Sequence, residues 1–271
     1  MTTVDGRRVV VTGAGGTIGR ALCEALVARG ARVVGLDLTP GTVAGSVPVL
    51  GCDITTQAPD GVARAIEQLG GLDLLVNNAG IGGPAPAELP PDAVVRAQLE
   101  VNLLAAWSVT AAALPALEAS RGRVVFIASR MAALALPLAA AYGVSKRALV
   151  AYADALRLEV GSHVGVTVVF PSMIASPIHD STAAAGLSLD GVSRYEPLSG
   201  VVGAVLRAAT ARRAPAELPT TRRGRFELFV ARHFPGVARR MVSRTVAARL
   251  AAGAFDDAPL AAGLRRRFSS R

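Results

Sequence analysis

The glycine-rich segment VTGAGGTIG, residues 11–19, constrains the fold of this chain more than any other stretch. It follows a β-branched run, RVVVT (8–12), which is typical of a strand buried on both faces. It precedes residues 18–30, whose apolar residues recur at helical spacing up to Gly30. A glycine-rich turn between a strand and a helix lets the backbone approach a pyrophosphate and directs helix N–H groups at it. The segment therefore predicts the first strand, turn and helix of a dinucleotide-binding α/β domain.

Strand-like and helix-like stretches alternate along the rest of the chain. The further predicted strands are residues 31–37, 47–53, 72–80, 122–129 and 165–172, and the further predicted helices are 60–69, 91–118 and 142–160. This rhythm is typical of an α/β, Rossmann-type fold with a doubly wound parallel sheet. We expect a single domain of this kind at residues 1–220, followed by a basic amphipathic helical C-terminal extension at residues 221–271.

The second predicted strand ends in an acidic residue, Asp37, which follows Gly19 by 18 residues. An acid at this place can accept hydrogen bonds from the hydroxyls of an adenosine ribose, and it repels a 2′-phosphate. Leu38, the next residue, supplies no cation to counter that repulsion. We therefore expect NAD as the cofactor and NADP to bind less well. The alternative for the two features is a tight turn and a surface aspartate.

The single lysine of the chain, Lys146, follows Tyr142 by four residues within a predicted helix. Residues at this spacing share one helix face. A phenol has a pKa of about 10, and a nearby cation lowers it, which makes the group a better general base. Ser129, at the end of the strand 122–129, could hydrogen-bond a carbonyl oxygen that gains charge in a transition state. The Tyr-x-x-x-Lys spacing by itself is common on helices.

The combination of motifs is more specific than any one of them. TGAGGTIG, NNAG (77–80), Asn102, Ser129 and YGVSK occur in the order and spacing of the short-chain dehydrogenase/reductase family. The chain resembles this family, in its single-domain form, over about residues 5–180.

The resemblance implies roles for four catalytic residues. Tyr142 would be the general acid/base, and Ser129 would orient and polarise the substrate oxygen. Lys146 would bind the nicotinamide ribose and lower the pKa of the tyrosine. Asn102 would support a water-linked proton relay.

The same resemblance implies which residues bind the cofactor. Asp53 and Ile54 would contact the adenine, Ile174 the nicotinamide carboxamide, and Ser176 a phosphate or the amide. The expected cofactor-binding residues are Gly13, Gly15, Gly16, Thr17, Ile18, Gly19, Asp37, Leu38, Asp53, Ile54, Asn78, Ala79, Gly80, Tyr142, Lys146, Pro171, Ile174 and Ser176.

A few positions depart from the family's usual pattern. Thr17 stands where the smaller members usually have glycine, and Ser172 and Ser176 replace a usual glycine and a usual threonine. All three residues are small, so we expect cofactor binding to be retained. Arg130 directly follows Ser129, and it either faces solvent or meets an anionic group of the substrate.

The resemblance places the substrate between the loop after Ser129 and the variable segment at about residues 172–200. The apolar residues of the first loop are Met131, Leu134, Leu136 and Leu138. They either line an apolar pocket, which suits a hydrophobic small molecule, or pack the core. We interpret His179 as a loop histidine, since the sequence offers it no partner.

The expected reaction interconverts a hydrophobic secondary alcohol, for which a steroid- or lipid-like molecule is one candidate, and its ketone. Tyr142 takes the hydroxyl proton while a hydride passes to the nicotinamide. The alternative is a non-catalytic NAD(H)-binding sensor or scaffold protein. Such a sensor needs only the glycine-rich end, so the intact set of Asn102, Ser129, Tyr142 and Lys146 argues against it.

The net charge of +9 lies in the C-terminal part of the chain. Residues 201–271 carry 15 arginines and four acidic residues, with apolar residues at helical spacing and Pro235 between two expected helices. These helices could pack on their own domain with a solvated arginine face, lie on an anionic membrane surface, or cover a partner subunit or the substrate. The segment has no recognised nucleic-acid-binding motif, so we expect no nucleic-acid partner.

The remaining expectations concern assembly and location. We expect a homodimer or homotetramer formed through the helices at about 91–118 and 142–160. The N-terminus lacks the apolar core of a signal peptide, and no uncharged apolar stretch reads as a membrane span. The expected location is cytoplasmic, either free or peripheral at a membrane. Cys23 and Cys52 give neither a disulfide framework nor metal-ligand spacing, so no metal site is expected.

Overall fold

The computed structural model describes residues 3–187 and 195–269, and its centre is an eight-stranded sheet. The strand order is β3-β4-β2-β1-β5-β6-β7-β8, and every neighbouring pair is parallel except β3 and β4. The strands are β1 (Arg8–Thr12), β2 (Arg32–Asp37), β3 (Gly41–Val43), β4 (Val47–Gly51), β5 (Leu74–Asn77), β6 (Arg123–Ile127), β7 (Gly165–Phe170) and β8 (Glu217–Pro219). The order reverses between β1 and β5, which is where open α/β sheets bind ligands.

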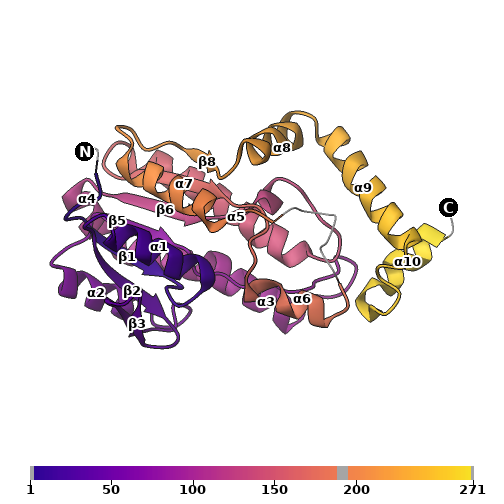
Figure 1. The fold of residues 1–271 in the computed structure, drawn as a ribbon, viewed down its shortest axis with the longest axis horizontal. Coiled ribbons are helices and arrows are strands. Elements are labelled where there is room, and N and C mark those ends of the chain that lie inside the picture. The colour runs from indigo at the N-terminus through magenta and orange to yellow at the C-terminus, as the bar shows by residue number, and fades with distance from the viewer. Residues whose placement is uncertain (1–2, 188–194, 270–271) are drawn as a thin grey trace.

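Helices cover both faces of the sheet (Figure 1). The helices of the α/β layers are α1 (Thr17–Val27), α2 (Ala58–Leu69), α3 (Ala93–Leu99), α4 (Ala106–Ser120), α5 (Ala140–Val160), α6 (Asp180–Ala184) and α7 (Leu198–Thr210). The pair α1 and α7 covers one face, and α2, α4 and α5 cover the other. This arrangement confirms the predicted Rossmann-type α/β fold.

The first strand shows why the sequence adopts this layered arrangement. Val9, Val10 and Val11 have no exposed surface. Successive strand residues point to opposite faces, so Val10 packs with α2, α4 and α5 while Val9 and Val11 pack with α1 and α7. A strand that lies between two cores needs apolar side chains on both of its faces, and the three consecutive valines of the predicted run RVVVT supply them.

The predicted helix 91–118 is present, but its interior is not uniform. Helices α3 and α4 are joined by a π-helical segment, Glu100–Ala105, which the sequence pattern did not predict. The continuous helix Ala93–Ser120 is long and apolar enough to span a membrane by length and composition. Its residues Val109, Ala113 and Leu117 are buried in the core over the sheet, which is the place of a layer helix in this fold.

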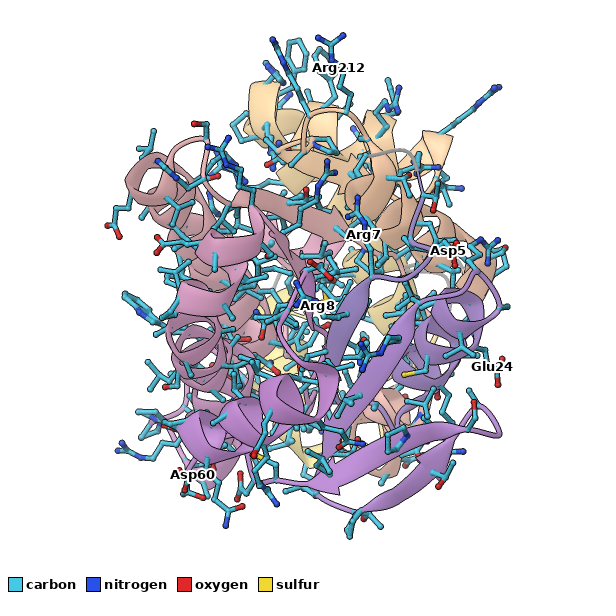
Figure 2. The ribbon with its side chains drawn as sticks, turned by 90° about the vertical axis from the view of Figure 1, so that its left-hand side faces the viewer. Asp5, Arg7, Arg8, Glu24, Asp60 and Arg212 are labelled. Atoms are coloured by element: carbon cyan, nitrogen blue, oxygen red, sulfur yellow. The ribbon has the colours of Figure 1, made fainter. Side chains whose placement is uncertain are left out.

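Arg7 and Arg8 lie at the start of β1, at the end of the sheet where the parallel strands begin (Figure 2). Arg8 donates two hydrogen bonds of 2.8 Å to the carboxylate of Asp73. Arg7 is buried and donates to the carbonyl oxygen of Ala209. The hydrogen bonds of Arg7 and Arg8 therefore connect β1 to the start of β5 and to α7. They lie at the opposite end of the sheet from the carboxyl ends of the strands.

Three further helices follow β8: α8 (Arg222–His233), α9 (Pro235–Ala251) and α10 (Ala262–Ser269). The break expected at Pro235 lies between α8 and α9. Figure 1 shows α9 projecting away from the sheet layers and α10 near its far end. A small apolar cluster joins this region to the rest of the molecule, because Phe255 and Ala258 pack with Leu138 and Leu187.

Candidate active site

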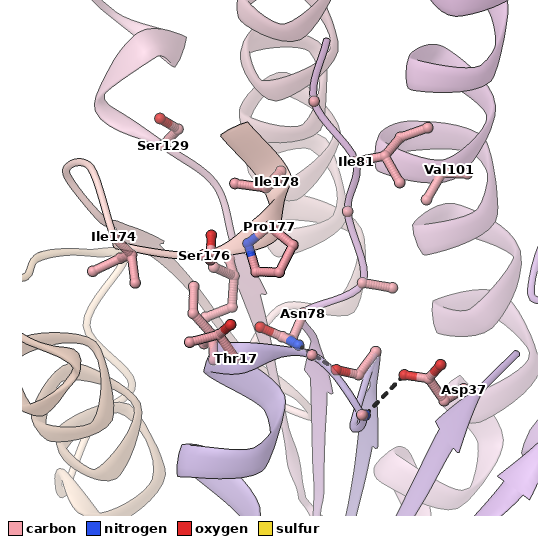
Figure 3. A pocket seen from close by; sticks show the side chains of 18 of the residues that line it. Thr17, Asp37, Asn78, Ile81, Val101, Ser129, Ile174, Ser176, Pro177 and Ile178 are labelled. Atoms are coloured by element: carbon pink, nitrogen blue, oxygen red, sulfur yellow. Dashed lines mark hydrogen bonds between the residues drawn. The ribbon is translucent and has the colours of Figure 1, made fainter. Parts of the chain in front are cut away.

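A cleft of about 880 Å³ opens over the carboxyl ends of the central strands. It is lined by every expected cofactor-binding residue except Gly19, and by every expected catalytic residue except Asn102. Figure 3 shows Thr17 at the start of α1, Asp37 at the end of β2, and Ser129, Ile174 and Ser176 on the other strands' loops. Strand ends far apart in sequence thus bring the predicted residues together.

The turn between β1 and α1 fits a phosphate group. A Cβ atom on Gly19 would lie 2.1 Å from the carbonyl oxygen of Gly13, so only glycine allows α1 to pack this closely against the turn. Helix α1 begins after Gly16 with no side chain capping its first N–H groups. Uncapped N–H groups at a helix start, facing a cleft, are suited to bind an anion. Gly19 therefore does not line the cleft, but its close packing against Gly13 shapes the turn that does.

Thr12 fixes the turn to the NNAG motif, and the sequence analysis did not single it out. Its buried hydroxyl accepts hydrogen bonds from the backbone N–H groups of Asn78 (3.0 Å) and Ala79 (3.1 Å). The Asn78 side chain donates in return to the carbonyl oxygens of Thr12 (2.9 Å) and Gly13 (3.1 Å). The only sequence signal for this role is that Thr12 ends a strand directly before the glycines.

Asp37 lies beside the glycine turn, and its carboxylate accepts a 2.8 Å hydrogen bond from the N–H of Gly15. Leu38 is exposed at the rim of the cleft. The structure adds a cation that the sequence analysis missed: Arg20 lines the same cleft, and its Nε donates to the carbonyl oxygen of Gly15 at 2.8 Å. The end of the cleft next to β2 therefore contains both a carboxylate and a guanidinium.

Tyr142 and Ser129 both line the cleft. Burial raises the pKa of Tyr142, and the neighbouring side chain of Ser129 opposes that effect in part. The Ser129 oxygen also accepts a 3.2 Å hydrogen bond from the N–H of Met131. This contact leaves the hydroxyl proton of Ser129 free to be donated to an oxygen.

Lys146 lies one helical turn after Tyr142 and is only 3% exposed. Its ammonium donates a 3.0 Å hydrogen bond to the carbonyl oxygen of Ile127. Burial lowers the pKa of Lys146 to about 8. A Cβ atom on Gly80 would lie 3.2 Å from this ammonium, so glycine at the end of NNAG keeps the space around the cation open.

Asn102 lies beside this site but outside the cleft wall. It sits in the π-helical segment, and its side chain accepts from the N–H of Ile81 (2.8 Å) and donates to the carbonyl oxygen of Ile81 (2.9 Å) and to Ser145 (3.0 Å). These contacts fix the chain after NNAG against α5. The side chain of Asn102 thus positions the cleft wall.

The side chain of Arg130 is only 13% exposed, so it does not face solvent as one of the two interpretations had it, and Arg130 is not among the residues that line the cleft. Its guanidinium forms an ion pair with Glu227 of α8, and the buried Glu196 adds a second favourable charge nearby. Glu196 in turn accepts hydrogen bonds from the N–H of Ser172 (2.9 Å) and from Thr220 (2.6 Å). The residue after Ser129 therefore anchors α8, a contact that the sequence pattern could not reveal.

The outer wall of the cleft differs from the predicted one. None of the four apolar residues Met131, Leu134, Leu136 and Leu138 lines this cleft. The apolar lining comes instead from Ile81 and Val101 on one side and Pro177 and Ile178 on the other (Figure 3). Residues 188–194 of the predicted substrate segment lie outside the described residues.

His179 also lines this outer part, which corrects its interpretation as a loop histidine without a partner. Its side chain hydrogen-bonds the backbone of Ile174, and burial lowers the pKa of His179. Its Nε2 atom is buried without a hydrogen-bond partner in the described part of the chain. A polar substrate group beside Ile178 could satisfy that atom.

Comparison with known proteins supports this site. A family model described as short chain dehydrogenase matches residues 7–185. The L-fucose dehydrogenase of Bos taurus is 35% identical over 199 residues, which cover 68% of this chain and 72% of that protein. The 3-ketodihydrosphingosine reductase of Bacteroides thetaiotaomicron is 32% identical over 169 residues, covering 60% and 62%.

Among solved structures, a short chain dehydrogenase from Burkholderia cenocepacia in complex with NADP matches with a TM-score of 0.76. It is 26% identical and covers 89% of this chain and 98% of that chain. The family match, the relatives and the shared fold agree with the cleft. The chain belongs to the short-chain dehydrogenase family, oxidoreductases that bind a nicotinamide cofactor and act on small molecules.

Proposed function

We propose that this protein is an NAD-dependent oxidoreductase that interconverts a hydrophobic secondary alcohol and its ketone. The observation that carries the proposal is that Tyr142, Ser129 and the buried ammonium of Lys146 line one cleft, with the ammonium 5.8 Å from the centre of the Tyr142 ring. An acid/base group, a hydroxyl donor and a cation then share one cleft with a turn suited to phosphate.

In the oxidation, the substrate hydroxyl lies between Tyr142 and Ser129. The nicotinamide, when bound, accepts the hydride from the carbinol carbon. Tyr142 takes the hydroxyl proton, and Ser129 donates a hydrogen bond to the same oxygen as its charge changes. In the reduction, Tyr142 returns its proton to the carbonyl oxygen.

The protonation state of Tyr142 depends on two opposing effects, its burial and the charge on Lys146. Burial raises the pKa of the phenol, which favours the protonated donor. A cation nearby favours the phenolate, which is the form that accepts the alcohol proton. Because the pKa of Lys146 is about 8, most of the lysine carries its charge at neutral pH. The pair can therefore serve both directions near neutrality.

The preference for NAD rests on Asp37. Its carboxylate lies at the end of β2, where it would accept hydrogen bonds from ribose hydroxyls and repel a 2′-phosphate. Arg20 is the opposing group, and its Nε is already engaged with the backbone of Gly15. Direct titration with NADH and NADPH tests the preference for NAD, and equal or tighter binding of NADPH would contradict it.

The substrate class rests on the outer wall formed by Ile81, Val101, Pro177 and Ile178. An apolar wall with one polar group, His179, suits a hydrophobic molecule that carries a single polar substituent. One relative is a 3-ketodihydrosphingosine reductase, whose name agrees with a lipid-like ketone. Another is an L-fucose dehydrogenase, so a sugar belongs in the substrate panel.

The test is nicotinamide-linked turnover followed by absorbance, with long-chain ketones, hydroxysteroids and L-fucose as substrates. We expect turnover of an apolar substrate that disappears in Tyr142→Phe while NADH binding remains. Turnover of L-fucose alone would overturn the substrate class. Intact NADH binding with no turnover across the panel would favour the alternative, a sensor or scaffold protein.

We also propose that the protein forms a homo-oligomer through the outer faces of the helix Ala93–Ser120 and of α5. Apolar side chains are exposed on both, and Leu158 on α5 is 85% exposed. On the former helix, Leu104 and Trp107 are exposed. Light scattering on the full chain tests this, with Trp107→Glu and Leu158→Glu expected to shift the mass towards a monomer.

A further inference from the structure

The outer faces of α8 and α9 carry apolar and basic side chains together. On α8, Arg222, Arg225, Phe226 and Phe229 occur at the spacing i, i+3, i+4 and i+7, which places them on one face. The face is exposed, with Phe226 at 66%. The family model ends at residue 185, so both helices lie outside the part of the chain that it matches.

Helix α9 repeats this arrangement. Val237, Arg240, Met241 and Arg244 again follow the spacing i, i+3, i+4 and i+7, and Met241 is 60% exposed. Phe234 lies between the two helices and contacts Phe229, with ring centres 6.1 Å apart. The two faces are thus continuous through an aromatic contact. We name the combined face the basic–aromatic surface; its residues are Arg222, Arg225, Phe226, Phe229, Phe234, Val237, Arg240, Met241 and Arg244.

The apolar residues of this surface are not the ones through which α8 and α9 pack on the rest of the protein. The buried residues of α8 are Gly224, Leu228 and Ala231, and those of α9 are Ala238 and Val246. Helix α8 thus packs on the domain through Leu228, while Phe226 and Phe229 remain exposed. A contiguous exposed apolar strip with a polar border is a mark of an interaction site.

The arginines of this surface are available for an external anion. In the described part of the chain, no carboxylate lies within ion-pair distance of Arg222, Arg225, Arg240 or Arg244. In contrast, Arg232 on another face of α8 pairs with Glu217. The basic charge of this surface is thus not neutralised by the molecule's own carboxylates.

A hollow of about 400 Å³ beside this surface has the chemistry of a phosphate site. It is lined by Gly236, Arg239, Arg240, Ser243 and Arg244. Guanidinium groups and a hydroxyl donate hydrogen bonds that match phosphate oxygens. The hollow shares Arg240 and Arg244 with the basic–aromatic surface, so a phosphate held there would lie next to the exposed apolar strip.

We propose that the basic–aromatic surface binds an anionic phospholipid bilayer. The arginines meet lipid phosphates, while Phe226, Phe229, Phe234, Val237 and Met241 enter the boundary between headgroups and acyl chains. A second copy of the same surface would place arginines against arginines, which opposes a symmetric dimer here. A nucleic acid would satisfy the arginines, but it would leave Val237 and Met241 without apolar partners.

The surface is connected to both sides of the substrate cleft. Glu227 of α8 pairs with Arg130, which follows Ser129. Beyond α9, Phe255 packs with Leu138 and Leu187 from the two loops next to the cleft. A bilayer bound at α8 and α9 would therefore hold the cleft near the lipid phase. The binding proposal itself does not depend on the reaction.

The test is sedimentation of the full chain with vesicles of phosphatidylglycerol and phosphatidylcholine, against vesicles of phosphatidylcholine alone. We expect pelleting only with the anionic vesicles, and weaker pelleting as salt rises. Replacing Arg222, Arg225, Arg240 and Arg244 together by Gln should weaken binding on the order of a hundredfold or more, since each cation near the surface contributes appreciably.

The matched control replaces four exposed arginines elsewhere, Arg29, Arg96, Arg147 and Arg212, by Gln. It changes the net charge equally and should retain binding. A third variant, Phe226→Ser with Met241→Ser, should weaken binding without changing the net charge. Circular dichroism checks that each variant is folded. The proposal would be overturned if the folded wild type did not pellet with the anionic vesicles, or if the control variant lost binding to the same extent as the test variant. It would also be overturned if soluble glycerophosphate abolished all pelleting, because the surface would then bind a free phosphate and not a bilayer.

Discussion

The ammonium of Lys146 lies 5.8 Å from the centre of the Tyr142 ring and donates a 3.0 Å hydrogen bond to the carbonyl oxygen of Ile127. The backbone contact holds the cation at this distance from the phenol. The position is costly for the fold, because burial lowers the pKa of the lysine from 10.5 to about 8. The site thus keeps a buried charge beside the phenol at the expense of stability.

This cost can be measured with Lys146→Met. A folded pKa below the unfolded value means that the unfolded chain binds more protons between about pH 8 and 10.5, so the lysine destabilises the fold below about pH 8. The shift corresponds to roughly 3 kcal/mol, and loss of the bond to Ile127 offsets about 1 kcal/mol of it. We expect the variant to be more stable than wild type in urea unfolding at pH 7.

The same variant should be inactive, and its advantage in stability should shrink as the pH rises from 8 to 10. Wild type gains stability in that interval because its lysine loses its proton. A variant that is less stable than wild type at pH 7 would contradict the cost of burial. Lys146→Arg is a useful control, since a guanidinium stays charged throughout this range.

The roles proposed for Tyr142 and Ser129 predict separable defects. Tyr142→Phe removes the proton donor and acceptor, so kcat should fall by about 10²–10⁴-fold. Ser129→Ala removes one hydrogen bond to the developing charge, which costs about 10²–10³-fold in kcat. Fluorescence titration should give unchanged NADH affinity for both. A large loss of NADH binding in Tyr142→Phe would assign that residue to the cofactor and away from proton transfer.

Much of the fold could be predicted because its determinants are local. Each central strand is a largely apolar run, β1 and β2 end in the polar residues Thr12 and Asp37, and the carboxyl ends of parallel strands lie at one end of the sheet. The motif residues therefore meet in one cleft. Short elements such as β8 were not predicted, since a three-residue edge strand has too little pattern of its own.

The parts that could not be predicted depend on contacts between distant segments. Arg130 meets Glu227 across 97 positions, and nothing near Arg130 in sequence indicates that partner. The apolar residues of the loop after Ser129 do not line the cleft, and one of them, Leu138, packs with the distant Phe255. For α8 and α9, helical spacing alone does not say which apolar residues are covered: Leu228 is buried, whereas Phe226 and Phe229 are exposed.

Asp37 gives a prediction for cofactor choice. Wild type should bind NADH at least tenfold more tightly than NADPH, because the carboxylate repels a 2′-phosphate. Asp37→Asn removes the charge but keeps an acceptor for the N–H of Gly15, so it should narrow the difference without a large loss of stability. Arg20→Gln provides the complementary control, and it should weaken NADPH binding if its guanidinium reaches the phosphate. The measurement is direct titration of each variant with both cofactors.

The ion pair between Arg130 and Glu227 predicts how α8 is held. Glu227 also pairs with Arg223, but the side chain of Arg130 is 13% exposed whereas that of Arg223 is 62% exposed. Exposed pairs contribute about 0.5 kcal/mol, while losing one partner of a largely buried pair costs several times more. We expect Arg223→Gln to change the free energy of unfolding by about 0.5 kcal/mol or less and Arg130→Gln to lower it by about 2 kcal/mol.

A double-mutant cycle with Glu227→Gln separates the interaction energy of the Arg130–Glu227 pair from the cost of leaving one buried charge without its partner. Coupling of more than about 1 kcal/mol between Arg130 and Glu227, with little coupling between Arg223 and Glu227, is the expected outcome of urea unfolding. Equal coupling for both arginines would mean that the buried pair does not anchor α8. Since Arg130 follows Ser129, loosening this anchor should also reduce kcat more than it changes the affinity for NADH, whereas Arg223→Gln should leave both unchanged.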